Sequence, residues 1–187
     1  MTEHAAYFEY LQGRSRLGYF YRTRYLYPRL FRFLHGRVLD VGCGIGDLLN
    51  ARPNTVGVDI NAAAVAWCRA RGWDARPMDA DHLPFQDAEF DGAVLDNVLE
   101  HVPDPVPLLR EVHRVLRANG TLIIGVPGPR GYERDPDHKV YYDERGLIEV
   151  LAPVRFHPRH LLHMPLRSRW LEQRLPQYCV YGVFQRG

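Results

Sequence analysis

Three glycines at alternate positions follow the apolar run 38–41 and are the most informative feature of the sequence: Gly42, Gly44 and Gly46. Glycine lets the backbone turn sharply and approach a ligand without a Cβ in the way, and a helix that starts after such a loop presents unpaired N–H groups. A second apolar run, Thr55–Ile60, contains Asp59, whose carboxylate can accept both hydroxyls of a ribose. The pattern predicts a site for an adenosine-containing cofactor.

The spacing of this glycine loop distinguishes two kinds of cofactor. The loop has the form GxGxG and follows Asp40, whereas the fingerprint of nicotinamide-binding domains is GxGxxG. The spacing therefore counts against a NAD-dependent oxidoreductase, which remains an alternative among enzymes. A non-catalytic cofactor-binding or interaction protein is the other alternative, because most of these features concern binding.

Five motifs follow one another between residues 37 and 127: VLDVGCGIG, VGVDI, MDADHLPF, FDGAVLDNVLEHV and LLREVHRVLRANGTLIIGVP. In this order they resemble the class I S-adenosylmethionine-dependent methyltransferases, most closely the small-molecule branch with ubiquinone-type and sugar methyltransferases. The resemblance implies S-adenosyl-L-methionine as cofactor and S-adenosyl-L-homocysteine as product. It also implies a Rossmann-like, doubly wound α/β fold with seven mostly parallel strands, an antiparallel last strand and helices on both faces.

The resemblance implies a set of cofactor-binding residues: Asp40, Gly42, Gly44, Gly46, Asp59, Ile60, Asp79, Ala80, Leu83, Asp96 and Asn97. The glycine loop and the acid before it frame the methionine part of the cofactor, and the acid of the second strand holds the ribose. Asp79 and the Ala80 backbone meet the edge of the adenine, and Leu83 packs against its face. Asp96 and Asn97 lie beside the methionine part and the methyl group.

Methyl transfer from a sulfonium is an in-line displacement, so the protein mainly positions the acceptor against the methyl group. A hydroxyl acceptor also needs a general base, and histidine suits that role near neutral pH. His101 is the first candidate, because it follows the end of the fourth predicted strand, where open α/β sheets place ligands. His138, with Asp137 as its orienting carboxylate, is the second. For both histidines a purely structural role is the alternative.

The sequence also limits the acceptor. Enzymes of this fold that methylate amino groups of nucleic acids use a [DN]PP[YFW] tetrapeptide after the fourth strand. That tetrapeptide does not follow the fourth predicted strand here, so methylation of adenine N6 is not expected. No dense lysine–arginine block indicates a nucleic-acid partner. The stretch after Val126 is too short for an inserted recognition domain. We expect a small molecule, or the exposed end of a glycan- or lipid-linked molecule, methylated at oxygen; the sequence leaves open whether the protein is a monomer or a homodimer.

The elements that position these residues alternate along the chain. Apolar runs predict buried strands, and apolar positions at three- and four-residue spacing predict helices. The strands are expected at 37–41, 55–60, 75–78, 90–95 and 121–126, and the helices between them at 47–50, 62–71 and 106–117. Asp104 and Asn119-Gly120 mark the two ends of the last helix. This alternation implies a parallel sheet with right-handed crossovers. A loop, a helix at 143–151 and an antiparallel strand pair at 154–164 and 178–185 follow.

Residues 1–36 are aromatic and basic and predict helices at 5–12 and 17–34 that pack on the main domain and cover its pocket. We expect a single domain with a helical arm at 1–36 and the methyltransferase domain at 37–187. An arm that only completes the core is one alternative. Another is that its arginines bind an anionic partner.

The composition fits this interpretation. The chain has 187 residues, of which 46% are hydrophobic and 25% charged, as in an ordinary one-domain protein. It lacks an apolar run of the ~20 residues that cross a bilayer, and its start lacks the features of a secretory signal, so we expect a cytoplasmic location. The three cysteines are scattered and the histidines show neither HxxxH nor HExxH spacing, so no metal site is expected.

Overall fold

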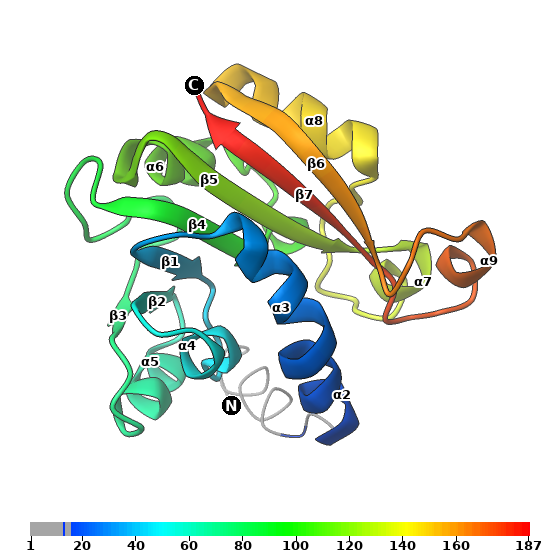
Figure 1. The fold of residues 1–187 in the computed structure, drawn as a ribbon, viewed down its shortest axis with the longest axis horizontal. Helices are drawn as coiled ribbons and strands as arrows, with labels where there is room; N and C mark the ends of the chain where they lie inside the picture. Colours follow the sequence, from blue (N-terminus) through cyan, green and yellow to red (C-terminus); the bar gives the residue numbers. More distant parts are fainter. Residues whose placement is uncertain (1–12, 14–15) are drawn as a thin grey trace.

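A computed structural model describes residue 13 and residues 16–187 of the chain. Its centre is a seven-stranded sheet with the strand order β3-β2-β1-β4-β5-β7-β6 (Figure 1). The strands are β1 (Val38–Val41), β2 (Thr55–Asp59), β3 (Ala75–Pro77), β4 (Phe90–Asp96), β5 (Leu116–Pro127), β6 (Phe156–Met164) and β7 (Cys179–Arg186). The first five pair in parallel, whereas β7 runs antiparallel between β5 and β6. The expected fold class, including the antiparallel last strand, is confirmed.

The helices connect the strands and cover the sheet. They are α4 (Asp47–Ala51), α5 (Ala62–Arg69), α6 (Val106–Val115), α7 (Pro129–Tyr132), α8 (Glu144–Leu151) and α9 (Arg169–Glu172), with 3₁₀ turns η3 (Leu99–His101) and η4 (Ala152–Val154). The expected boundary between α6 and β5 is wrong. The spacing predicts that α6 continues to residue 117, but Leu116 already pairs with Phe90 of β4, so α6 ends earlier and Asn119 lies within β5.

Side chains of the central strands alternate between the two faces of the sheet, as the pleat requires. Leu95 of β4 and Ile124 of β5 belong to the larger apolar cluster, which α6 and α8 cover with their buried leucines and valines. Val94 and Ile123, one residue earlier, belong to a second cluster on the other face. Both faces are therefore buried, which explains why these strands appear in the sequence as continuous apolar runs.

The N-terminal arm supplies much of the second cluster. It is a helical run of four parts: α2 (Arg16–Tyr21), the π-helical turn η1 (Arg22–Leu26), α3 (Tyr27–Leu30) and the 3₁₀ turn η2 (Phe31–Phe33). Leu26, Leu30 and Leu34 are each at most 5% exposed and pack with Tyr181 and Val183 of β7. This half of the arm is thus part of the core. The helix predicted at 5–12 lies outside the described residues.

Candidate functional site

A cavity of about 400 Å³ opens at the carboxyl ends of β1, β2 and β4. Parallel α/β sheets bind ligands at this edge, and the volume is in the range of small-molecule sites. Many of the expected site residues line it: Asp40, Gly42, Gly44, Asp59, Ile60, Ala80, Asp96, Asn97, His101 and Asp137. The fold therefore brings residues from separate segments of the chain to one place.

The glycine loop leaves β1 in a conformation that only glycine adopts easily. Gly42 has a φ of +73°, and a Cβ at this position would lie 2.6 Å from a methyl group of Val98. The loop is therefore packed tightly against the chain that follows β4. Gly46, with a φ of +81°, does not line the cavity; it starts α4, and a Cβ there would lie 2.6 Å from the Trp73 ring.

Asp59 connects the end of β2 to the glycine loop. Its Oδ2 accepts a hydrogen bond from the Gly44 N–H at 2.8 Å, and its Oδ1 accepts one from the Asn61 N–H at 2.8 Å. Each carboxylate oxygen can accept more than one hydrogen bond. The same group can therefore hold the loop and bind the hydroxyls of a ribose, beside the half-exposed side chain of Ile60.

Asp96, at the end of β4, joins three elements of the fold. Its Oδ2 accepts a hydrogen bond from Arg22 of the arm, and its Oδ1 accepts one from the Tyr181 hydroxyl of β7 at 2.8 Å. The side-chain amide of Asn97 donates to the same Oδ1 at 3.0 Å. Arg22 Nε also lies 3.4 Å from Asp47 at the start of α4. A guanidinium is thus held between two carboxylates at the cavity wall.

Asp40 is buried at the end of β1 and also faces the cavity. Its burial, and next the nearby charge of Asp96, raise the pKa of Asp40 well above the usual range. These influences favour the protonated carboxyl, which can donate a hydrogen bond.

The expected adenine contacts are only partly present at the cavity. Ala80 lines it, but Leu83 is fully buried in the larger apolar cluster, where its backbone N–H donates to Glu111. Asp79 pairs with His82 in a short bridge and does not line the cavity. Met78 supplies apolar surface there instead. Leu83 therefore has no surface at the cavity in this structure, and its packing against the adenine stays a prediction.

The two candidate histidines lie together, with ring centroids 4.7 Å apart. His101 of η3 lines the cavity, and its Nδ1 lies 3.4 Å from Oδ2 of Asp137. The side chain of His138 is 8% exposed, and its Nδ1 pairs with the Tyr132 carbonyl oxygen at 2.8 Å. The expected pairing is therefore corrected: Asp137 contacts His101 rather than His138. Burial, and next His138, lower the pKa of His101 and favour its neutral form.

Glu100 lies next to this histidine pair and is 1% exposed. Within the described chain neither of its carboxylate oxygens has a hydrogen-bond partner, and Oε1 lies 3.8 Å from Nε2 of His138. Burial raises the pKa of Glu100 to about 8. Glu100, His101 and His138 also each offer an atom within 4.8 Å of the others, a grouping that could hold a metal ion and that the sequence analysis does not anticipate.

Several residues at the cavity are absent from the sequence-based set. Arg22 and Tyr27 come from the arm, Asp47 comes from the first turn of α4, and Met78 directly follows β3. The only sequence feature that points to Arg22 is its place in an aromatic and basic helix. No sequence pattern predicts its contact with Asp96. In the part of the chain that the structure describes, no helix is long and apolar enough to span a membrane.

Comparisons with known proteins give a consistent result. Residues 39–124 match the family model described as a methyltransferase domain. A probable S-adenosylmethionine-dependent methyltransferase of Mycolicibacterium smegmatis is 36% identical over 74% of this chain and 59% of its own. The 27-O-demethylrifamycin SV methyltransferase of Amycolatopsis mediterranei is 33% identical over 62% of this chain and 48% of its own. The chain thus spans about half to three fifths of these relatives.

A solved structure covers the whole fold. The crystal structure of a SAM-dependent methyltransferase from Archaeoglobus fulgidus superposes with a TM-score of 0.76, over 99% of this chain and 100% of the other. The two sequences are 18% identical, so this likeness concerns the fold.

Proposed function

Because the chain belongs to the class I S-adenosylmethionine-dependent methyltransferases, we propose that it transfers a methyl group to an oxygen atom of a small molecule or of a sugar in a polysaccharide precursor. One observation carries this proposal. A single cavity combines the glycine loop and Asp59, which suit the cofactor, with His101 and Asp137, which suit an acceptor hydroxyl. A protein that only binds the cofactor would not need the second pair.

The residues present fit S-adenosylmethionine. Gly42 and Gly44 line the cavity with their backbone, and Asp59 offers acceptors for the ribose hydroxyls. Arg22 presents a guanidinium fork to the cavity, and such a fork matches a carboxylate. We assign it to the carboxylate of the methionine part. Asp96, which holds Arg22 in place, would then act as its positioning residue.

When bound, the cofactor supplies a methyl group activated as a sulfonium. The acceptor oxygen forms a bond to this carbon while the carbon–sulfur bond breaks, so the remaining task is to orient the hydroxyl and take its proton. In His101, Nδ1 is directed toward Asp137, so Nε2 is the nitrogen we assign as the base. The neutral form that its surroundings favour is the form that accepts a proton.

The proposal is tested by measuring the formation of S-adenosylhomocysteine with a panel of hydroxyl, amine and carboxylate acceptors. Turnover with hydroxyl acceptors, sensitive to substitution of His101, is the expected result. Turnover only with amines or carboxylates would contradict transfer to oxygen. Cofactor binding without turnover on any acceptor would favour the non-catalytic alternative.

The NAD-dependent alternative has a separate test. Calorimetric titration with S-adenosylmethionine, S-adenosylhomocysteine and NAD should give binding for the first two only. The GxGxG spacing of the glycine loop favours this outcome, because nicotinamide-binding domains have GxGxxG. Binding of NAD alone would contradict the proposal.

A further inference from the structure

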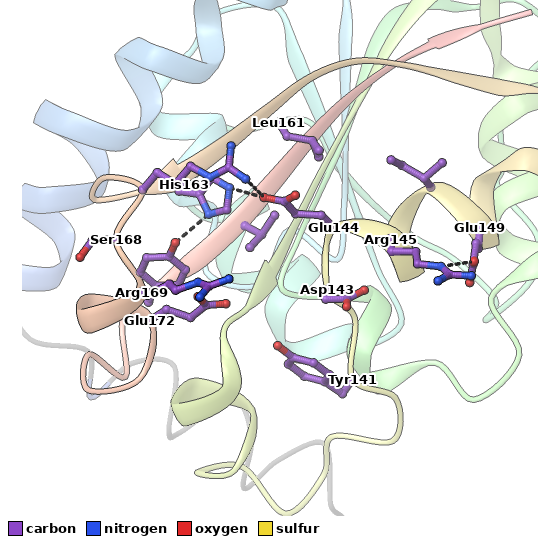
Figure 2. Close-up of a pocket in the computed structure, with 14 residues that line it drawn as sticks. Tyr141, Asp143, Glu144, Arg145, Glu149, Leu161, His163, Ser168, Arg169 and Glu172 are labelled. Atoms are coloured by element: carbon purple, nitrogen blue, oxygen red, sulfur yellow. Dashed lines mark hydrogen bonds and ion pairs between the residues drawn. The ribbon is translucent and has the colours of Figure 1, made fainter.

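A groove of about 580 Å³ lies between α8, α9 and the ends of β6 and β7 (Figure 2). It shares no lining residue with the cofactor cavity. Cys179 of β7 pairs with Pro127 of β5 and with Met164 of β6, so these three strand ends lie at one edge of the sheet. The cofactor cavity opens at the ends of β1, β2 and β4, along the same edge. The groove thus lies beside the catalytic edge and has no role in the mechanism above.

A chain of three polar side chains fixes one wall of the groove. The Tyr178 hydroxyl and Nδ1 of His163 are 2.7 Å apart, and Nε2 of His163 lies 2.5 Å from Oε1 of Glu144 (Figure 2). The His163 side chain is only 9% exposed. These three side chains link the residue before β7 to β6 and α8. The groove is therefore shaped before a ligand enters, which lowers the ordering cost of binding.

The charges of the groove are nearly balanced. Four carboxylates and three arginines line it, and two of the arginines are paired: Arg145 with Glu149 at 2.7 Å, and Arg167 with Glu144 at 3.3 Å. The side chains of Arg169 and Glu172 lie at the groove, and neither has an ion-pair partner among residues 16–187. A strongly charged ligand gains little here, whereas a neutral ligand with many hydroxyls finds both a donor and an acceptor.

The groove also has an aromatic and apolar surface. Tyr141 is 42% exposed, and its ring lies at the groove below the polar wall (Figure 2). Ile148 and Leu161 add apolar lining. A sugar ring has an apolar C–H face and polar hydroxyl edges, so it can pack on the aromatic face while its hydroxyls reach Arg169 and Glu172.

The groove is connected to the cofactor cavity by one short segment. Asp137 lines the cavity and Tyr141 lines the groove. Four residues span at most about 14 Å. A continuous row of rings follows the same path, with centroids 4.7 Å apart from His101 to His138, 5.2 Å to Tyr132 and 5.3 Å to Tyr141. A molecule that reaches both places is longer than one sugar ring.

From this arrangement we propose that the groove binds a sugar unit of the acceptor that is remote from the methylated atom. The acceptor is then a glycoside or an oligosaccharide of at least two rings. This inference rests on the proposed function for the methyl transfer, but the binding of the sugar itself does not depend on it.

The test uses the full chain and saturation-transfer NMR with a panel of methyl glycosides and methyl disaccharides of hexoses, deoxyhexoses, pentoses and amino sugars. The variants are Tyr141→Ala, Arg169→Ala and Glu172→Gln, and the matched control is Arg110→Ala, an exposed arginine of α6 away from the groove. We expect a disaccharide to bind more tightly than its monosaccharide. Each groove variant should weaken that binding by about tenfold or more, a loss of about 1.4 kcal/mol, while the control and the affinity for S-adenosylhomocysteine stay unchanged.

Two results would overturn the inference: no saturation transfer to any sugar of the panel, or sugar binding that the three groove variants leave unchanged. In either case normal binding of S-adenosylhomocysteine would leave the proposed function intact. Sugar binding that the groove variants abolish, together with no cofactor binding, would support the groove and contradict the proposed function.

Discussion

Asp59 illustrates how one side chain can serve both the fold and the ligand. Its two oxygens hold the backbone of the glycine loop and of Asn61, and the proposed ribose contact uses the same group. Replacing it by alanine should weaken the affinity for S-adenosylhomocysteine ten- to a hundredfold, because a charge-assisted contact of about 1.5–3 kcal/mol is lost. Calorimetry measures this loss.

The control for Asp59→Ala is thermal unfolding of the variant without ligand. It shows whether the substitution has destabilised the folded protein rather than removed a contact to the cofactor. Asp74→Ala, at a half-exposed acid outside the cavity, is the matched substitution. Unchanged affinity in a folded Asp59 variant would move the ribose site elsewhere.

His101 and His138 should differ in their effect on turnover. His101→Ala should lower kcat by about 10²–10⁴, the usual contribution of a general base, with little change in cofactor affinity. The His138 ring packs against His101 and does not line the cavity. His138→Ala should therefore loosen acceptor binding and mainly raise KM, because the group that takes the proton stays in place. His35→Ala, at an exposed histidine, is the control. The reverse pattern would make His138 the base.

The pH dependence of turnover follows from the same histidine. Burial and His138 lower the pKa of His101, so the neutral base persists to a lower pH than for a free histidine, whose pKa is about 6.5. The acidic limb of kcat/KM should therefore lie below that value and disappear in His101→Ala.

A metal ion at Glu100, His101 and His138 would give another signature, namely turnover abolished by EDTA and restored by a divalent cation.

Glu100 should make the stability of the protein depend on pH. Its folded pKa is raised to about 8, whereas the unfolded carboxyl titrates near its ordinary value of 4.5. Between these values the folded state binds one proton more than the unfolded state, so stability falls as the pH rises, by at most about 1.4 kcal/mol per unit. Glu100→Gln removes this term. Its unfolding midpoint in urea, relative to the native protein, should increase from pH 5 to pH 8; a constant difference would contradict it.

At the level of the element, the π-helical turn η1 contains the arm residue that we assign to cofactor binding. π-Helical turns often occur at functional sites, and η1 begins with Arg22, which reaches Asp96 and Asp47. Arg22→Met should weaken cofactor binding about ten- to a hundredfold, and Arg22→Lys less, because lysine keeps the charge but not the fork. Arg24→Met, exposed on the same turn, should bind normally in calorimetry. Equal affinities for all variants would remove Arg22 from the site.

The following part of the arm should matter for stability rather than for binding. Leu30 is 1% exposed within the second cluster, so Leu30→Ala should reduce the free energy of unfolding by about 2–5 kcal/mol. Leu17→Ala, at a residue that is 81% exposed, should change it little. Urea denaturation compares the two. If a chain without residues 1–36 were still stable, residue 36 would be a true domain boundary. That result would contradict a role of the arm in the core.

For the whole molecule, cofactor binding should stabilise the fold, because the cavity is lined by the arm, β1, β2 and β4 together. A ligand at 100 times its Kd adds about 2.7 kcal/mol to the folded state. S-adenosylhomocysteine should therefore raise the thermal midpoint, and NAD should not. Differential scanning fluorimetry measures both; a shift with NAD alone would favour the oxidoreductase.

The fold could be predicted from the sequence because its strands are buried on both faces and its glycine loop is local. The features that the sequence could not predict are contacts between residues far apart in the chain and the directions of single side chains. Arg22 and Asp96 are 74 positions apart, and no local pattern joins them. Leu83 points inward, and Asp137 contacts His101 rather than its sequence neighbour. The groove combines residues from Tyr141 to Val180, so its existence could not be inferred from any one motif.

The packing of the arm against the last strand also constrains how the chain is made. A ribosome releases Leu26 and Leu30 long before their partners Tyr181 and Val183, which lie far along the chain. β7, which lies between β5 and β6, is missing from the nascent sheet until then. Folding during translation can therefore join β1 to β5, but the apolar face of the arm must wait for β7. The arm can therefore dock on the sheet only after β7 has been made, and a chain cut before Cys179 would leave β5 and β6 separated by an empty position.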